Sequence, residues 1–356
     1  MRLAPVLVVV LLAATCLAPF AQAEGAPRSV ACTAGALPAA LWQTYAARFI
    51  GPDGRVVDDG NDGISHSEGQ GLALLLAEAM GDRHTFDRVW DWTQRHLRVR
   101  DDALFAWRWD PQQGVTDPNN ATDGDLLIAW ALARADTRWG DAGYADAASA
   151  IALAVRQSLV REQGGLALLL PGAAGFEHAT GTVLNLSYYV FPAFAVLDRV
   201  DPAPQWHDLR RTGVNLLQRT GFGRWALPPD WLQWSAGASR LAEQFPPRFG
   251  YAAVRIPLYL LWAGIDDPEL LKPYRDFWGF LEGGRVFSAW TNLDDDSIDS
   301  HGAPTGVRAV ALLTRLFDPD HPGAIVVWPE LAADETYYSA TLALAARLVA
   351  IERCAA

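Results

Sequence analysis

An acidic residue stands at the expected start of a helix, in the run Ser65-His66-Ser67-Glu68-Gly69-Gln70-Gly71. Polar residues and glycines precede an apolar stretch, so Glu68 is expected in the first turn, where its side chain could face a cleft. A carboxylic acid there could protonate a leaving oxygen if a partly apolar site or a second acid raised its pKa. The alternative is that Glu68 only complements the helix dipole.

A second cluster combines aromatic and acidic side chains. Trp107 and Trp109 flank an arginine, and together they could form a stacking wall for a flat ligand. Asp123 and Asp125 begin the next expected helix and point in different directions, so they need different partners. One could bind sugar hydroxyls while the other holds the loop, whereas a helix N-cap alone would explain only one of them.

Two further groups could complete a site. Tyr188, in the run Asn185-Leu186-Ser187-Tyr188-Tyr189, has a hydroxyl that can orient a water or a carboxylate, although packing in the core is the alternative. Arg255 lies among apolar residues in the segment from Phe249 to Pro257, and a guanidinium there needs a carboxylate or carbonyl partner.

Composition restricts the partners of the chain. Its 356 residues carry a formal net charge of −12, which disfavours binding to nucleic acid or to anionic lipid. Fifteen tryptophans suit a ligand with flat sugar faces, although most of them are expected in the core. The histidines lack metal-ligand spacing and no glycine-rich phosphate loop occurs, so no metal and no cofactor are expected.

The N-terminus has the pattern of an export signal. Arg2 precedes an apolar run, and Ala21-Gln22-Ala23 fits the small-x-small cleavage rule, so cleavage is expected after Ala23. The leader has no other charged residue, which changes the net charge of the remaining chain to −13. The apolar run is short for a membrane anchor, and Cys16 follows a residue that fits a lipoprotein signal poorly. The protein is therefore expected in the periplasm or outside the cell, with no membrane span after processing.

Cys32 and Cys354 remain after processing, at opposite ends of the mature chain. Export would place them in an oxidising compartment, where they could form a disulfide or stay as two free thiols.

Helical periodicity dominates the remaining chain. Small apolar helices alternate with charged amphipathic ones, which favours an inner ring covered by an outer ring in a single domain over 24–356. Short strands are expected at Leu166–Leu170 and Ala324–Val327, and the segments Phe222–Gly250 and Gly283–Gly302 lack periodicity. The expected helices are Gly69–Met80, Thr85–Arg98, Asp123–Thr137, Tyr144–Arg161, Thr182–Val200, Pro204–Thr220, Ala252–Gly264, Pro268–Glu282, Thr305–Phe317 and Tyr337–Ile351.

These motifs together resemble glycoside hydrolase family 8. The run Ala121-Thr122-Asp123-Gly124-Asp125-Leu126-Leu127-Ile128-Ala129 is specific to that family, and the other similar stretches follow in family order over nearly the whole mature chain. Within the family, the chain is most similar to the periplasmic endoglucanases encoded with bacterial cellulose synthase. These other stretches are Ser67–Gly71, Leu104–Trp109, Val115–Ala131, Ser187–Pro192, Tyr251–Pro257 and Tyr337–Leu348.

The resemblance implies an all-α (α/α)6 barrel with an open substrate cleft at one end, and inverting hydrolysis of β-1,4-glucan. It implies that Glu68 is the proton donor and that Asp123 binds the sugar at the cleavage point, the residue that older descriptions of the family call the nucleophile. Tyr188 matches a tyrosine that helps hold the attacking water, and Arg255 matches an arginine beside the catalytic base. As further substrate-binding residues, we expect aromatic rings to line the cleft, namely Trp107, Trp109, Tyr188, Trp231 and Tyr251.

The sequence departs from the family at its general base, because Ala252 stands where close relatives have aspartate. An inverting enzyme needs a carboxylate about 6.5–9.5 Å from its acid to activate water, and alanine cannot accept a proton. Ala252 could be an engineered change, or another acid could act as the base. Of these acids, Asp230 and Glu243 would be the first candidates, whereas Asp58, Asp59 and Asp62 are expected on the same side of the cleft as Glu68.

The expected function is therefore that of an endo-β-1,4-glucanase which trims cellulose during its synthesis and export, with the cellulose synthase export machinery as a possible partner. One alternative is a non-catalytic periplasmic glucan-binding protein of the same fold. Another is a family member that acts on xylan or chitosan.

Overall fold

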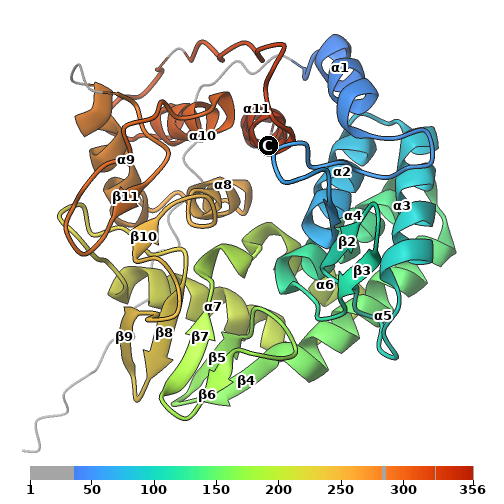
Figure 1. Ribbon diagram of the computed structural model, residues 1–356, viewed down its shortest axis with the longest axis horizontal. Helices are drawn as coiled ribbons and strands as arrows, with labels where there is room; N and C mark the ends of the chain where they lie inside the picture. Colours follow the sequence, from blue (N-terminus) through green and yellow to red (C-terminus); the bar gives the residue numbers. More distant parts are fainter. Residues whose placement is uncertain (1–35, 283–285, 325, 356) are drawn as a thin grey trace, which may run out of the picture.

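Helices alternate along the chain between an inner ring and an outer layer in the computed structural model, which describes residues 36–282, 286–324 and 326–355. In the ring each helix packs on the next, and the last packs on the first (Figure 1). The inner helices are α2 Ser67–Ala79, α4 Thr122–Trp139, α6 Phe191–Val200, α8 Arg255–Trp262, α10 Thr305–Leu316 and α11 Tyr337–Ala355. The outer helices among the described residues are α1 Ala39–Phe49, α3 Arg83–Leu97, α5 Ala142–Leu159, α7 Pro204–Arg219 and α9 Pro268–Glu282.

This arrangement confirms the expected all-α fold with an inner and an outer layer. The place of a sixth outer helix, between α10 and α11, is taken by residues 318–336, whose described part contains no helix. None of the helices in the described part of the chain is long and apolar enough to cross a membrane.

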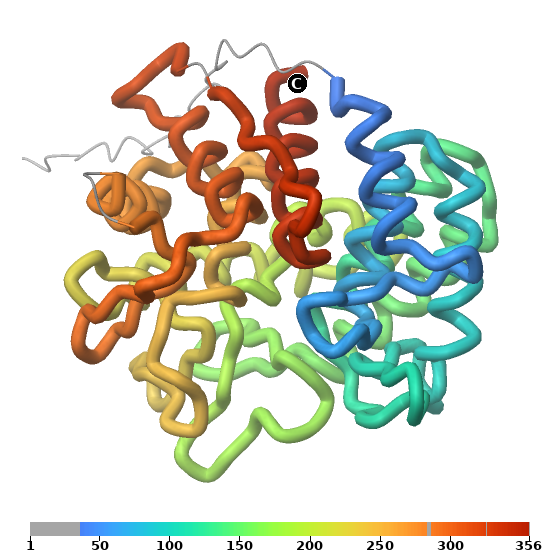
Figure 2. The backbone as a smooth tube through the Cα atoms, turned by 45° about the horizontal axis from the view of Figure 1, so that its top comes forward, coloured from blue at the N-terminus to red at the C-terminus, as the bar shows by residue number. Residues whose placement is uncertain are grey.

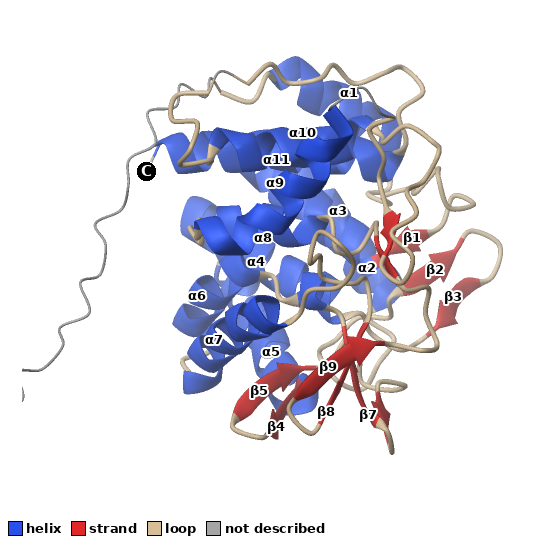
Figure 3. Ribbon diagram, turned by 90° about the vertical axis from the view of Figure 1, so that its left-hand side faces the viewer, coloured by secondary structure: helices blue, strands red, loops and turns tan. Residues whose placement is uncertain are grey.

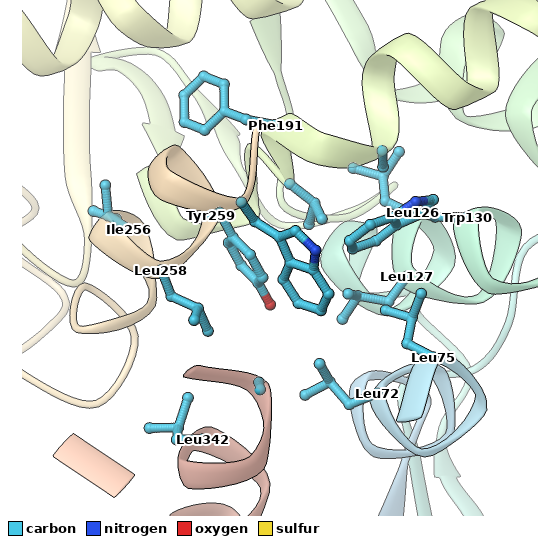
Figure 4. Packing of buried hydrophobic residues seen from close by; sticks show 14 of the residues in the cluster. Leu72, Leu75, Leu126, Leu127, Trp130, Phe191, Ile256, Leu258, Tyr259 and Leu342 are labelled. Atoms are coloured by element: carbon cyan, nitrogen blue, oxygen red, sulfur yellow. The ribbon is translucent and has the colours of Figure 1, made fainter. Parts of the chain in front are cut away.

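The two layers differ in the way the sequence predicted. In α7, an outer helix, the buried residues recur at helical spacing and face the inner ring, while charged side chains lie between them. Inner helices such as α2 and α4 are buried on nearly all sides by apolar and small residues. Figure 4 shows that side chains from α2, α4, α8 and α11 meet inside the ring, among them Leu72, Leu127, Tyr259 and Leu342.

The two ends of the described chain meet beside the place where α11 closes the ring on α2. Helix α1 packs against α11, as the blue and dark red tubes show in Figure 2. Tyr45 of α1 also shares a hydrogen bond of 2.9 Å with Thr341 of α11. Cys354 is disulfide-bonded. The expected partner, Cys32, lies outside the described residues, as do Cys16 and the proposed export signal, so the pairing stays a prediction.

Short antiparallel strands lie in the loops that connect the helices. The sheet β1–β2–β3 consists of Ser65–His66, Arg108–Asp110 and Gly114–Asp117, and it lies at the end of the ring opposite the C-terminus (Figure 3). The remaining strands are β4 Val160–Gln163 paired with β5 Leu166–Leu169, the sheet β6 Glu177–His178, β7 Gly181–Leu184, β8 Leu232–Ser235 and β9 Ala238–Leu241, and the pair β10 Arg248–Phe249 and β11 Thr291–Asn292.

Some expected elements were wrong. The helix expected over Thr182–Val200 begins only at Phe191, because residues 182–184 belong to β7, which pairs with β8, and a 3-10 turn at Leu186–Tyr188 follows. Apolar periodicity cannot distinguish a buried strand followed by a turn from a helix of the same length. Helix α1 was missed, and the described residues of the expected strand at 324–327 form no strand.

Candidate active site

The candidate residues gather where the inner helices begin. Glu68 is the second residue of α2, Asp123 is the second residue of α4, and Arg255 is the first residue of α8. The outer helices return the chain between these inner helices, so the N-termini of α2, α4 and α8 lie at the same end of the ring. Helix N-termini carry partial positive charge, which favours carboxylates at this end.

Two glycines allow α2 and α4 to approach closely. A Cβ atom on Gly71 would lie 2.6 Å from the Cβ of Leu127, and one on Gly124 would lie 2.1 Å from the Oγ of Ser67. Any larger residue at either position would force the helices apart. The close contact sets the first turns side by side and therefore brings Glu68 near Asp123.

One guanidinium joins the two acids. Nη1 of Arg255 lies 2.7 Å from Oε1 of Glu68 and 2.8 Å from Oδ2 of Asp123. The side chain of Glu68 is 19% exposed, whereas that of Asp123 is only 1% exposed. Glu68 is thus the acid that a ligand can reach, while Asp123 is held beneath it.

Burial and charge set the protonation of this group. Burial raises the pKa of Asp123 to about 6, with a further contribution from the Glu68 carboxylate, and Arg255 opposes both effects. Burial alone would lower the pKa of Arg255, but the two carboxylates outweigh it, so the pKa is well above its usual value. Arg255 therefore stays charged throughout the range in which Asp123 titrates.

A second nitrogen of Arg255 anchors the segment before α6. Nη2 donates to Oγ of Ser187 at 3.1 Å, and that hydroxyl donates to Oδ1 of Asn185 at 2.7 Å. The Tyr188 ring lies 5.7 Å from the guanidinium. Burial, with a contribution from Asp123, raises the pKa of Tyr188 well above its ordinary value. The phenol therefore remains a neutral O–H donor beside the two acids.

The turn that carries Ala252 is fixed by Asp230. Oδ1 of Asp230 accepts backbone N–H groups from Gly250, Ala252 and Ala253 at 3.0, 3.1 and 2.8 Å. Oδ2 lies 3.2 Å from Nε of Arg248. Asp230 is buried and engaged in structural contacts, which does not suit the role of substitute base. Glu243, the other candidate base, is exposed in the segment between β9 and β10.

Two of the expected aromatic residues, Trp107 and Tyr251, lie beside the site and are not fully buried. The backbone of Trp107 accepts the N–H of Ser67 at 3.1 Å, next to Glu68, and its indole donates to Oδ2 of Asp117 at 2.7 Å. Tyr251 is 40% exposed and packs edge-on against Tyr338, whose hydroxyl donates to the Tyr251 carbonyl. Both lie next to residues of the site and could contact an extended ligand.

Protein groups pack on the rings of two other expected aromatic residues. Trp231 stacks on both Phe176 and Phe245, with interplanar angles of 6° and 13°, so its faces are used by protein rings. Trp109 packs beneath the guanidinium of Arg55, 4.7 Å from its ring, and edge-on against Trp92. The sequence shows that these residues are aromatic, but not which face each ring leaves free.

Asp125 holds the loop, which is the structural role that the sequence analysis expected for one of the two acids Asp123 and Asp125. Its carboxyl accepts the N–H of Phe105 at 2.9 Å and the amide of Asn120 at 2.8 Å, and burial raises its pKa to about 8. It therefore holds the loop before α4. Among the described residues, no three or more histidines, cysteines, aspartates or glutamates gather in a way that could hold a metal ion.

Sequence reasoning missed His66, which precedes Glu68 by two residues. Its Nδ1 accepts the N–H of Gly69 at 3.0 Å and caps α2, while its Nε2 lies 3.3 Å from Oδ2 of Asp58. Histidine is not among the favoured N-cap residues, so capping preferences alone do not reveal it. Asp58 was expected on the Glu68 side, and this contact places it there.

Comparison with protein families gives one match over most of the chain. The sequence model described as glycosyl hydrolases family 8 matches residues 14–351. A probable endoglucanase from Novacetimonas hansenii is 40% identical over 307 residues, which cover 85% of this chain and 88% of that protein. An endoglucanase from Cellulomonas uda is 40% identical over 278 residues, covering 77% and 76% of the two chains.

Solved structures show the same likeness. The endo-β-1,4-glucanase CMCax from Acetobacter xylinum superposes with a TM-score of 0.80 at 37% identity, covering 92% of this chain and 99% of that one. The xylose complex of Rex8A from Paenibacillus barcinonensis has a TM-score of 0.70 at 19% identity, which shows a shared fold.

Proposed function

Because the chain belongs to glycosyl hydrolases family 8, we propose that it is an endo-β-1,4-glucanase that hydrolyses glucan with inversion and uses Glu68 as its proton donor. The observation that carries the proposal is the shared guanidinium of Arg255, which holds a reachable acid and a buried acid at one end of the ring. Relatives at about 40% identity bear endoglucanase names, which supports a glucan substrate.

In this proposal, two acids and a tyrosine each have a separate task. Glu68 donates its proton to the glycosidic oxygen as the bond to the leaving sugar breaks. Asp123 binds the sugar at the cleavage point and holds Arg255 in place. Tyr188, a neutral donor, orients the attacking water.

Glu68 and Asp123 cannot form the acid–base pair of an inverting enzyme. Both bind the same nitrogen of Arg255, so their bound oxygens are separated by no more than the sum of two hydrogen-bond distances. An inverting pair needs about 6.5–9.5 Å between its carboxyl groups to leave room for water. The base must therefore be a different group. The family resemblance places it at position 252, on a turn that Asp230 holds in place, but the alanine there cannot accept the proton of the attacking water. Hydrolysis by this chain therefore needs another carboxylate, and Glu243 is the exposed candidate.

Ala252 also favours a second candidate function. With no carboxylate at this position, the chain could bind glucan in the same site without cutting it. The proposed setting, cellulose trimming in the periplasm beside the synthase export machinery, rests on the leader pattern of the N-terminus and on the family resemblance.

The test is the release of reducing sugar from soluble cellulose, xylan and chitosan, with binding measured in parallel. Glu68→Gln should abolish hydrolysis and leave glucan binding near normal, because an amide cannot donate the proton. Glu162→Gln, which changes an exposed glutamate on β4, is the matched control and should keep full activity. Parental turnover in Glu68→Gln would remove Glu68 from the mechanism, and binding without turnover in the parent would favour the glucan-binding protein.

A further inference from the structure

The helix that carries Glu68 is capped by a histidine. His66 has extended backbone angles, φ −141° and ψ 155°, and its Nδ1 accepts the N–H of Gly69 at 3.0 Å. The preferred N-cap residues, Ser, Thr, Asp and Asn, make this contact with a short side-chain oxygen. An imidazole can do the same only from an unprotonated ring nitrogen.

Asp58 selects the form of the ring that the cap needs. Its Oδ2 lies 3.3 Å from Nε2 of His66, and both side chains are largely buried, at 12% and 14% exposure. A carboxylate beside Nε2 favours the tautomer with its proton on that nitrogen, which leaves Nδ1 free to accept. Asp58 is itself fixed, because its other carboxylate oxygen accepts the N–H of Gly60 at 3.2 Å.

The ring is also enclosed by its neighbours. Tyr337 at the start of α11 packs edge-on against His66, with ring centroids 5.7 Å apart. A Cβ atom on Gly69 would lie 2.9 Å from the Tyr337 hydroxyl and 3.2 Å from Cε1 of His66. The glycine therefore lets both rings approach the first turn of α2, and the imidazole has little room to rotate.

Glu68 lies between the capping residue and the capped one. Any movement of the first turn therefore moves its backbone, and Arg255 is the partner that holds its carboxylate. We propose that Asp58 and His66 act as a positioning pair, which holds the first turn of α2 in the geometry that places the Glu68 carboxyl against Arg255 and the substrate. This inference rests on the proposed role of Glu68 as the proton donor.

The protonation of His66 determines the conditions for a test. An imidazolium donates from both nitrogens and cannot cap the helix. Burial lowers the pKa of His66, but the hydrogen bond to Asp58 and the charges of Glu68, Asp58 and Asp123 outweigh burial and raise it. Variants should therefore be compared with the parent over a pH series and judged at its alkaline end, where the neutral ring is favoured.

The test compares His66→Ala, His66→Asn and Asp58→Ala. Each change is made in the chain with the higher turnover, which is either the parent or Ala252→Asp. His66→Ala should lower kcat about 10- to 100-fold with little change in KM, because a displaced acid costs rate more than binding. His66→Asn should recover most of the loss, since asparagine is a good N-cap. Asp58→Ala should lower kcat in the same direction, because the ring then loses its tautomer preference.

Asp141→Ala is the matched control for the loss of a cap. Asp141 caps the outer helix α5 through the N–H of Gly143 at 3.1 Å, far along the chain from Glu68. Its loss should lower the melting temperature by about 2 °C and leave kcat unchanged. If His66→Ala behaves in the same way, His66 is only a structural cap and the inference is overturned.

The two proposals fail differently. An inactive Glu68→Gln beside a fully active His66→Ala would overturn the positioning pair alone. An active Glu68→Gln, or no turnover in any of these chains, would overturn the proposed function and the positioning pair with it.

Discussion

The change Ala252→Asp tests the missing base directly. The turn from Gly250 to Ala253 is already fixed by three N–H bonds to Oδ1 of Asp230, so a carboxylate added at 252 should start from an ordered backbone. Ala252 is half-buried, which leaves its side chain in contact with solvent. A positioned general base contributes roughly 10²- to 10⁴-fold in rate, which corresponds to about 3–5 kcal/mol.

The charge of Asp230 adjusts this expectation, because it would repel the carboxylate introduced by Ala252→Asp. Two like charges about 6 Å apart interact by roughly 3 kcal/mol at an effective dielectric constant of about 20. Arg248, 3.2 Å from Asp230, cancels part of that repulsion. The remainder should raise the pKa of the new carboxyl group and make it a stronger base. We therefore expect a gain within the full range of about 10²- to 10⁴-fold.

The assay is turnover on carboxymethyl-cellulose, with Ala252→Asn as the control. Asparagine has the shape of aspartate but cannot accept the proton, so it should give no gain. An equal gain in both variants would mean that shape, not basicity, was missing. No gain in Ala252→Asp over an active parent would place the base elsewhere, and no activity in any form would favour the glucan-binding protein.

Three further predictions concern pH, stacking and the disulfide. In an active His66→Asn chain, whose helix cap does not titrate, kcat/KM should fall about tenfold per unit as the pH drops below about 6, because Asp123, whose pKa is about 6, must be ionised to pair with its arginine. A flat profile from pH 7 to 5 would contradict this. The same raised pKa has the opposite effect on stability, since the folded chain binds the proton more tightly: this contribution is full below about pH 4 and is lost as the pH rises to about 6. Trp107→Ala should raise KM about 2- to 13-fold, for a stacking contact of about 0.5–1.5 kcal/mol. Trp231→Ala should instead lower the melting temperature and leave KM unchanged, because the Trp231 ring stacks on two phenylalanines. Equal effects of the two changes on KM would refute the distinction. Peptide mapping without reductant should recover Cys354 joined to Cys32, and reduction should cost about 2–4 kcal/mol of stability; a different partner for Cys354 would overturn the pairing.

The sequence alone was sufficient for the layered helical fold. Alternating apolar and amphipathic segments predicted both layers, because the period of buried residues depends only on local helix geometry. Periodicity failed at residues 182–188, where a buried strand and a 3-10 turn replace the expected helix. Strand pairing between β7 and β8 joins residues about fifty positions apart, and no local pattern encodes it.

Residue types and spacing also identified Glu68, Asp123, Tyr188 and Arg255 as candidate site residues, since each stands out chemically in its segment. Only the tertiary structure placed both acids on one nitrogen of Arg255 and made one acid reachable and the other buried. That arrangement depends on Gly71 and Gly124, which let two inner helices touch.

The sequence by itself determined that alanine occupies position 252 and that Trp231 is aromatic. Only the tertiary structure decided that Asp230 is engaged beneath the turn at 252, that two phenylalanines stack on the Trp231 ring, and that His66 caps the helix of Glu68. The physical reason is that a side chain's type fixes which interactions it can make, whereas its available partners depend on which segments, distant along the chain, the fold brings together.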